Sequence, residues 1–142
     1  MREYIKKEVV KLVKKYKTRN PFEIAKNENI IVIYEELGSI NGYYNKFARQ
    51  KFIHINSNLS EQMQIVTCAH ELGHSRLHPN ANTPLFRKNT FYSINKLERQ
   101  ANYFASELLI DTDNFIYEYT INQLANYYKV PIELIKIKYN VF

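Results

Sequence analysis

Residues 60–77, SEQMQIVTCAHELGHSRL, decide how this chain is expected to fold and which chemistry it can support. Ser60 is a residue type that caps helix starts, and Asn58 is an alternative cap because Glu61 stands three positions after it. Pro79 cannot continue a helix, so the helix must end before it. The stretch therefore predicts one helix over about residues 60–77.

The run His70-Glu71-Leu72-Gly73-His74 lies inside this helix. Residues four apart differ by about 40° around a helix, so His70 and His74 project to the same side and can chelate one metal ion. Glu71 lies about 100° from His70 and about 60° from His74, where it can flank the ion as a general base without binding it. The pattern predicts a zinc (Zn2+) peptidase site, and another divalent metal is compatible with it.

The other side of the same helix is apolar, which argues against a surface helix that carries two histidines by chance. Ile65, Val66 and Ala69 supply this apolar side, and Cys68 belongs with them as a core residue rather than a ligand. Gly73 costs a helix roughly 1 kcal/mol relative to alanine, so its presence indicates that a small residue is required there.

A catalytic zinc site needs a third protein ligand, which must come from another element. His78 is excluded because its Cα lies about 12 Å along the helix axis from that of His70. Glu98 is the best candidate, since it lies early on the next predicted helix, beside that helix's apolar stripe. Asn102, one turn later, can reach the second nitrogen of a ligating histidine and fix its tautomer. On spacing alone, Glu98 fits equally well as an exposed carboxylate at a helix start.

The rest of the chain predicts a small sheet and further helices around this central helix. The predicted elements are a basic helix over about 2–18, a short helix from Asn20-Pro21, strands at Ile30–Tyr34, Tyr43–Phe47 and Gln50–Ile55 within a sheet over about 30–56, the helix over about 60–77, an irregular loop over 78–92, a helix over about 93–109 and a helical hairpin over about 120–138. The β-branched strand at Ile30–Tyr34 is expected to be buried on both faces. The fold class predicted for 1–142 is a single α+β domain, mainly helical, with a three-stranded β-sheet.

The formal net charge of +6 is concentrated in the first segment of the chain. Residues 2–19 carry eight Lys/Arg and two Glu, whereas the remaining twelve basic and twelve acidic residues cancel. Such a segment can bind nucleic acid or an acidic partner, but it is more often the solvated face of an amphipathic helix. A single cysteine, no signal-peptide pattern and no long apolar run predict a cytoplasmic protein without a membrane anchor.

The HELGH run and the later block Glu98-Arg-Gln-Ala-Asn-Tyr-Phe-Ala-Ser-Glu-Leu-Leu109 together resemble the ImmA/IrrE metallopeptidase family. Ile53-His-Ile-Asn-Ser57 and Leu124-Ala-x-x-Tyr-x-Val130 look like further family features, so the resemblance covers most of the chain. It implies that Glu98 is the third metal ligand and that the fold is a thermolysin-like (zincin) catalytic core with its sheet over the active-site helix. Ile110-Asp111 departs from the Met-Pro of many relatives, so the substrate side of the site is expected to differ locally.

The resemblance also implies a biological role. Family members typically act in bacteria and their mobile elements, where they cleave a helix-turn-helix repressor and so release its target genes. The expected reaction is metal-assisted peptide hydrolysis, with Glu71 taking the proton of the attacking water. His78, His54 and Tyr103 are candidate contacts to the transition state or the substrate, and the strand that carries His54 can pair with an extended substrate.

Two other classes of function remain open on the sequence. The chain can be a metal-containing binding module that holds a repressor or antitoxin partner without cutting it, although the intact Glu71 argues against a purely structural metal. Residues 121–135 have the apolar spacing of a helix-turn-helix, which suggests direct DNA binding. Lys129 at the turn and the mostly apolar segment 132–138 argue against that reading.

Overall fold

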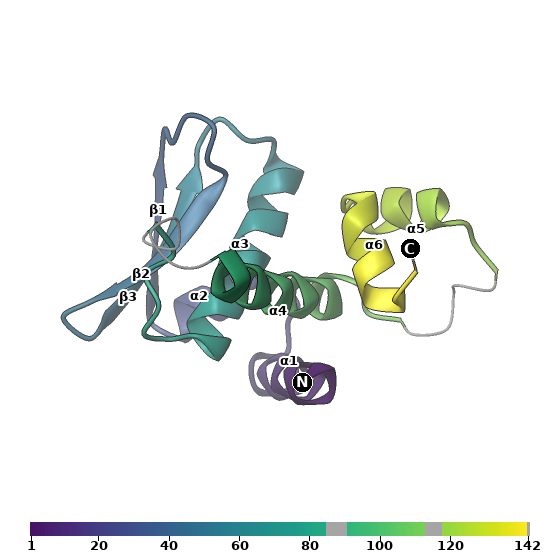
Figure 1. Ribbon diagram of the computed structural model, residues 1–142, viewed down its shortest axis with the longest axis horizontal. Coiled ribbons are helices and arrows are strands. Elements are labelled where there is room, and N and C mark those ends of the chain that lie inside the picture. The colour runs from purple at the N-terminus through teal and green to yellow at the C-terminus, as the bar shows by residue number, and fades with distance from the viewer. Residues whose placement is uncertain (85–90, 113–117, 142) are drawn as a thin grey trace.

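Six helices and a three-stranded sheet make up the part of the chain that the computed structural model describes, residues 1–84, 91–112 and 118–141 (Figure 1). In chain order they are α1 (Arg2–Tyr16), α2 (Pro21–Asn27), β1 (Ile30–Glu35), β2 (Gly42–Phe47), β3 (Gln50–Asn56), α3 (Glu61–Leu77), α4 (Phe91–Leu109), α5 (Ile121–Tyr128) and α6 (Ile132–Tyr139). The predicted α+β class is confirmed. Residues 85–90 of the predicted loop lie outside the described residues.

α3 packs against the sheet and against α4, so it occupies the centre of the fold (Figure 1). Ser60 caps its start, because the Ser60 side-chain oxygen accepts a hydrogen bond from the Met63 amide at 3.2 Å. The alternative cap at Asn58 is wrong, since the helix begins at Glu61, directly after Ser60. The helix ends at Leu77, before the proline that the sequence marks as its limit.

β3 is the central strand of the sheet, parallel to β1 and antiparallel to β2. The two-residue turn between β2 and β3 consists of Ala48 and Arg49, both in the left-handed region with φ of 50° and 69°. Positive φ at both positions is what a tight hairpin turn requires. Ile53 and Ile55 of β3 are fully buried, as is Cys68 of α3, which is a core residue as predicted.

The expectation that the Ile30–Tyr34 strand is buried on both faces is wrong. Ile31 is 46% exposed and Tyr34 is 53% exposed. β1 is an edge strand that packs against α2, and these two side chains reach solvent. β-branched residues favour a strand whether or not both of its faces are covered, so the residue types alone did not reveal its position in the sheet.

Two contacts near its C-terminal end hold α4 in place. Arg19, in the connection after α1, donates hydrogen bonds to the carbonyl oxygens of Glu107 and Leu108, both at 3.0 Å. The Glu107 carboxylate also accepts a hydrogen bond from Lys138 Nζ of α6 at 2.9 Å, and both side chains are almost completely buried. These contacts fix the position of α4, which carries Glu98, relative to the N-terminal helices and to α6.

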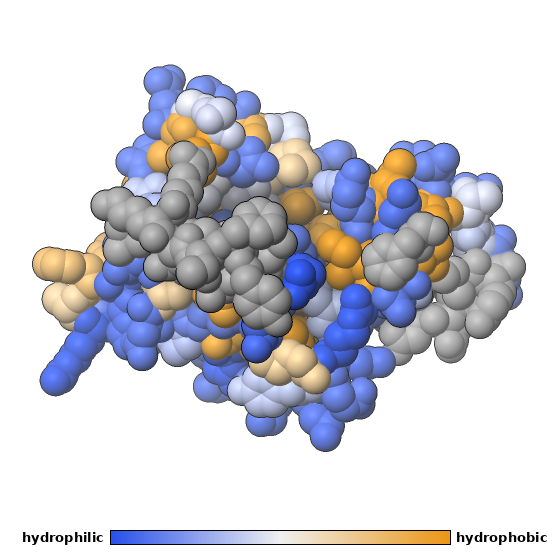
Figure 2. Space-filling view, viewed as in Figure 1, coloured by the Kyte–Doolittle hydropathy of each residue, from blue (hydrophilic) through white to orange (hydrophobic). Residues whose placement is uncertain are grey.

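The predicted C-terminal helical hairpin is present as α5 and α6, and α6 packs against α4. Leu134 and Ile135 of α6 are buried, so these two apolar residues serve packing. Figure 2 shows apolar surface over the hairpin and hydrophilic surface over much of the rest of this face. Within the described ranges, no helix combines the length and the apolar character needed to cross a membrane.

Gly73 marks a close approach between α3 and α4. A Cβ atom at Gly73 would lie 3.1 Å from both Cβ and Cδ1 of Phe104 and 3.2 Å from the Ala101 carbonyl oxygen. The Phe104 Cβ and the Ala101 carbonyl cannot move away unless α4 moves with them. The requirement for a small residue at this position is therefore confirmed.

We expect Gly73→Ala to lower the free energy of unfolding by about 1 kcal/mol. Alanine improves helix propensity by about 1 kcal/mol, but overpacking a tight interface typically costs about 1–3 kcal/mol. Urea denaturation of the metal-free protein measures the difference. Gln62→Ala, on an exposed position of α3, is the matched control and should change stability by less than about 0.5 kcal/mol. A Gly73→Ala protein more stable than the wild type would contradict the close packing.

Candidate metal centre

Two histidines of α3 and one glutamate of α4 converge at one point. His70 Nε2 lies 3.0 Å from Glu98 Oε2, and His74 Nε2 lies 2.8 Å from Glu98 Oε1. The imidazole rings meet edge to face, with their centroids 4.9 Å apart. One helical turn along α3 thus brings both Nε2 atoms against a single carboxylate from the neighbouring helix.

Glu71 flanks this cluster and is almost completely buried, with 5% of its surface exposed. Its Oε2 atom lies 4.0 Å from His70 Nε2, and ligand-type atoms of His70, Glu71 and His74 all lie within 4.8 Å of one another. Glu98 is nevertheless the stronger candidate for a third ligand, because its carboxylate contacts both imidazoles directly. Glu71 Oε1 is buried and has no hydrogen-bond partner among the described residues.

The two glutamates of the site have pKa values shifted in opposite directions. Burial raises the pKa of Glu71 to about 7, with His70 opposing the shift and the charge of Glu98 adding to it. Burial also acts to raise the pKa of Glu98, but hydrogen bonds from His70 and His74 hold that pKa well below its usual value. The site therefore holds one firmly ionised carboxylate beside a second carboxyl group that titrates near neutral pH.

The two histidines also differ in their pKa values. Burial lowers the pKa of His74 to about 4, which keeps this ring neutral at neutral pH. Burial acts in the same direction on His70, but the contacts with Glu98 and the charge of Glu71 raise its pKa above the ordinary value. A metal ion must displace a proton from a protonated imidazole before it can bind, so binding at a ring such as His70 would depend on pH.

The Nδ1 atom of each histidine also has a partner. His70 Nδ1 lies 2.7 Å from Asn102 Oδ1, so Asn102, which the sequence predicts to orient a ligating histidine, contacts one of the two candidate histidines. An amide oxygen accepts, so His70 Nδ1 carries the hydrogen of this contact, and Nε2 is the nitrogen that faces Glu98. His74 Nδ1 lies 3.1 Å from His78 Nδ1, and His78 Nε2 lies 2.6 Å from Gln100 Oε1. Gln100 was not predicted, because no motif or spacing singles it out.

The donor set fits a divalent ion of the zinc type. Two imidazole nitrogens and one carboxylate, with room for a further ligand, are the composition of a catalytic zinc site. The buried Glu71 Oε1 supports this fit, since a buried polar atom without a partner is costly unless a group entering the site binds it.

A cleft gives solvent access to the cluster. Its walls include Gly42 of β2 and Met63 and Thr67 of α3, together with His70 and Glu98. A Cβ atom at Gly42 would lie 2.7 Å from Thr67 Cγ2 and 2.5 Å from a carbonyl oxygen of β3, so only glycine lets β2 pass this close to the helix. The edge of β2 therefore borders the cleft.

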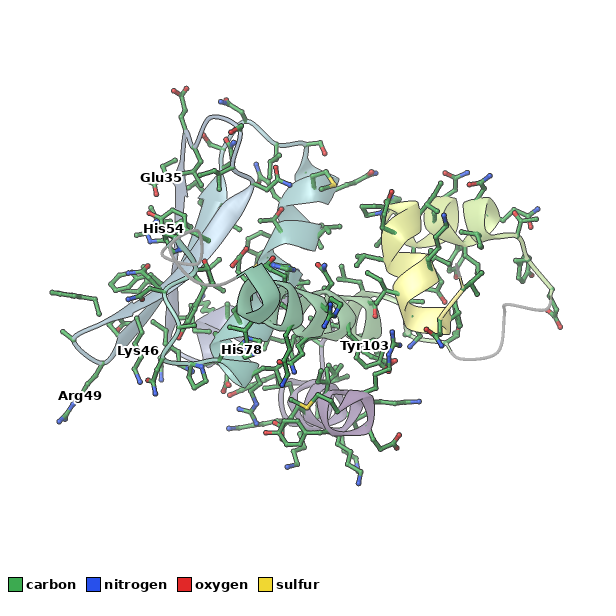
Figure 3. The ribbon with its side chains drawn as sticks, viewed as in Figure 1. Glu35, Lys46, Arg49, His54, His78 and Tyr103 are labelled. Carbon is green, nitrogen blue, oxygen red and sulfur yellow. The ribbon has the colours of Figure 1, made fainter. Side chains whose placement is uncertain are left out.

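His54, Tyr103 and His78 were also predicted to contact substrate or the transition state, and none of them lines the described cleft (Figure 3). His54 points away from the buried Ile53 side of β3, and its Nδ1 lies 2.7 Å from Glu35 Oε1. The Tyr103 hydroxyl donates to Glu107 at 2.9 Å on the side of α4 that faces α1. His78 reaches the cluster only indirectly, through its contact with His74.

Comparison with known proteins agrees with this geometry. Residues 25–140 match the family model described as the IrrE N-terminal-like domain, a peptidase family, and the match includes every residue of the cluster. The chain belongs to this family.

Two relatives show how far the similarity extends. The chain is 44% identical over 139 residues to the "uncharacterized immunity region protein 2" of Bacillus phage phi105, which covers 94% of this chain and 88% of that protein. It is 37% identical over 143 residues to the metallopeptidase ImmA of Bacillus subtilis (strain 168), and the aligned region covers 89% of this chain and 79% of that protein. Membership in the IrrE-like family supports a peptidase that uses a metal, and the His70, Glu71 and His74 group can bind one.

Glu98→Gln should weaken zinc binding by more than about a hundredfold. Residues that merely support metal ligands typically cost 10- to 100-fold in affinity when changed, and this variant removes the charge of a group that contacts both imidazoles. Competition with a chromophoric chelator measures the dissociation constant. Glu133→Gln, at an exposed position of α6, is the matched control. Equal zinc affinity of the two variants would exclude Glu98 as a ligand.

Glu71→Gln should stabilise the metal-free protein by an amount that grows with pH. The pKa of Glu71 is raised from 4.5 to about 7, so the folded state favours the protonated carboxyl group. Wild-type stability from this group is fully present below about pH 4.5 and is lost as pH rises through about 7, a difference of roughly 3 kcal/mol. Glutamine carries no charge and avoids this loss. Urea denaturation between pH 5 and pH 8 tests the trend, and a pH-independent difference would contradict it.

Proposed function

We propose that residues 1–142 form one zinc-dependent peptidase domain that cleaves a partner regulatory protein in the cytoplasm. The observation that carries this proposal is the convergence of His70, His74 and Glu98 beside a buried Glu71 whose Oε1 no described residue binds. His70, His74 and Glu98 would hold the ion, and Glu71 would be the catalytic base.

The chemistry follows from the positions of these groups. Zinc, when bound, supplies a Lewis acid that polarises the scissile carbonyl and acidifies a nearby water. Glu71 accepts the proton of the attacking water and delivers it to the leaving amine, and a carboxyl group with a pKa near 7 can perform both transfers. Asn102 keeps a hydrogen on His70 Nδ1, so that Nε2 would be the nitrogen that binds the ion.

The substrate is proposed to enter as an extended segment along β2. The expectation that the strand of His54 pairs with substrate is wrong, because β3 is already paired on both sides. β2 is an edge strand, but Thr83 and Asn82 already bind its Tyr44 and Lys46 amides. Gly42 presents its backbone groups to the same outer side and lines the cleft. An extended peptide can therefore pair with β2 directly beside the reactive cluster.

The proposed target is a helix-turn-helix repressor whose cleavage releases genes of a mobile element or a stress response. The ImmA/IrrE resemblance supports this class of partner. The names of the two relatives also support it, since one denotes a phage immunity region protein and the other a metallopeptidase. A protein substrate is consistent with an open cleft that Gly42 of the edge strand β2 borders.

Glu71→Gln should abolish cleavage of this repressor while leaving zinc bound. Loss of general acid–base catalysis typically lowers a rate by about 10²- to 10⁴-fold, whereas the three proposed ligands are unchanged. The purified zinc-loaded protein is incubated with the helix-turn-helix repressor encoded nearest to its gene, and the fragments are separated on a gel and identified by mass spectrometry. Undiminished cleavage by a clean Glu71→Gln preparation would refute the assignment of the base.

The same incubation separates the peptidase from a binding module. A chelator should stop cleavage by the wild type, and added zinc should restore it. If the wild type leaves the repressor at full length but retains it in a pull-down, the chain acts by association and the proposed hydrolysis is wrong.

A further inference from the structure

A chain of hydrogen bonds extends from His74 away from the cleft. His74 Nδ1 lies 3.1 Å from His78 Nδ1, and His78 Nε2 lies 2.6 Å from Gln100 Oε1. His74 is fully buried and Gln100 is 9% exposed, whereas His78 between them is half-buried. The mechanism proposed above uses neither His78 nor Gln100.

The chemistry of the three side chains decides which atom donates in each of these hydrogen bonds. The Gln100 amide oxygen only accepts, so the hydrogen of the 2.6 Å contact lies on His78 Nε2. A neutral imidazole with a hydrogen on Nε2 has its lone pair on Nδ1. When an ion replaces the proton between His74 Nε2 and Glu98, His78 Nδ1 can accept the Nδ1 hydrogen of His74, which leaves the His74 Nε2 lone pair to bind the ion.

We propose that His78 and Gln100 are positioning residues that hold His74 in the tautomer and ring orientation needed to bind the metal ion. This inference rests on the proposed metal-dependent function. It assigns to His74 the same kind of support that Asn102 gives to His70. When an ion takes the place of a proton between His74 Nε2 and Glu98, the His74 hydrogen must lie on Nδ1 and needs an acceptor there.

The surrounding structure holds His78 in position for this role. Its backbone amide donates to the His74 carbonyl oxygen at 2.7 Å, which closes the last turn of α3. The carbonyl oxygen of the next residue, Pro79, accepts a hydrogen bond from the Tyr44 hydroxyl at 2.6 Å, and Tyr44 is fully buried. The chain on both sides of the His78 side chain is thus fixed to neighbouring elements.

The placement of Gln100 explains why it acts through His78. Residues two apart on a helix lie about 200° apart around it, so Gln100 faces away from Glu98 and Asn102. It lies on the α1 side of α4, beside Arg2 and Tyr103. His78, at the end of α3, spans the distance between Gln100 and His74. One helix therefore supplies a carboxylate to the cleft and acceptors that support each of the two histidines.

Two variants of similar size test the role of His78. In His78→Asn, the side-chain oxygen can take the place of Nδ1 and accept the His74 hydrogen, whereas His78→Leu offers no acceptor. Zinc affinity, measured by competition with a chelator, should fall by about 10- to 100-fold in His78→Leu and by less than about tenfold in His78→Asn. The d–d absorption spectrum of the cobalt-substituted protein should change in His78→Leu and stay close to that of the wild type in His78→Asn.

A second pair of variants tests the role of Gln100. Gln100→Glu keeps an acceptor for His78 Nε2, and Gln100→Met removes it with little change in shape. Zinc affinity should decrease in Gln100→Met and not in Gln100→Glu. In the zinc-loaded wild type, the His74 Nδ1 proton should be visible by NMR and protected from exchange with water, and this protection should be lost in His78→Leu. Thermal unfolding of each metal-free variant shows whether it folds.

Equal zinc affinity of His78→Leu and the wild type would overturn the inference. Equal losses of zinc affinity in His78→Leu and His78→Asn would also overturn it, because they indicate a packing role alone. Failure of the proposed function gives a different result, because the wild type itself would then bind no zinc or leave the repressor uncut. Zinc binding and cleavage by the wild type with no effect of His78→Leu would refute this inference only.

Discussion

The close crossing of α3 and α4 is the feature on which the site depends. At Gly73 the two helices approach so closely that a single methyl group would contact Phe104 and the Ala101 carbonyl at 3.1–3.2 Å. His70 and His74 lie on one helix and Glu98 on the other, so this separation fixes the distance between the imidazoles and the carboxylate. Arg19 and Lys138 hold the far end of α4 and prevent it from sliding along α3. The absence of a side chain at Gly73 thereby determines how far the two imidazoles lie from the Glu98 carboxylate.

Burial acts on all the ionisable groups of the site, but their partners decide the result. Glu98 accepts hydrogen bonds from two imidazoles, and these outweigh its loss of hydration. Glu71 is more deeply buried and contacts neither ring at hydrogen-bond distance, so its pKa rises to about 7. Two glutamates a few ångströms apart are thus suited to different tasks, one as a charged ligand and one as a proton acceptor and donor. The two pKa values differ because of where the carboxylates lie. Glu98 of α4 faces the Nε2 atoms of both histidines, whereas Glu71 of α3 only flanks them.

The sequence predicted the parts of the fold and of the candidate site that depend on local periodicity. Helical spacing was sufficient to place His70, Glu71 and His74 on one helix, and Pro79 was sufficient to predict where that helix ends. Glu98 was left open on spacing alone, because whether α4 turns this residue toward α3 depends on a tertiary contact. The burial of β1 was predicted wrongly for a similar reason, since its residue types do not say where in the sheet a strand lies. Gln100 could not be found at all, because its contact with His78 exists only once the end of α3 has packed against α4.

The candidate metal cluster and the net positive charge lie in different parts of the molecule. All the groups proposed to react or to hold the ion lie between residues 70 and 102, whereas the net charge of +6 lies within residues 2–19. The apolar side of α1 is buried through Ile5, Val9 and Leu12, and α1 packs against α4. Its lysines therefore border a surface other than the cleft, where Lys7 and Lys14 line a shallow hollow. A positive surface of this kind acts over a Debye length of about 10 Å, and it can guide an acidic partner to the molecule without altering the pKa balance at Glu71 and Glu98.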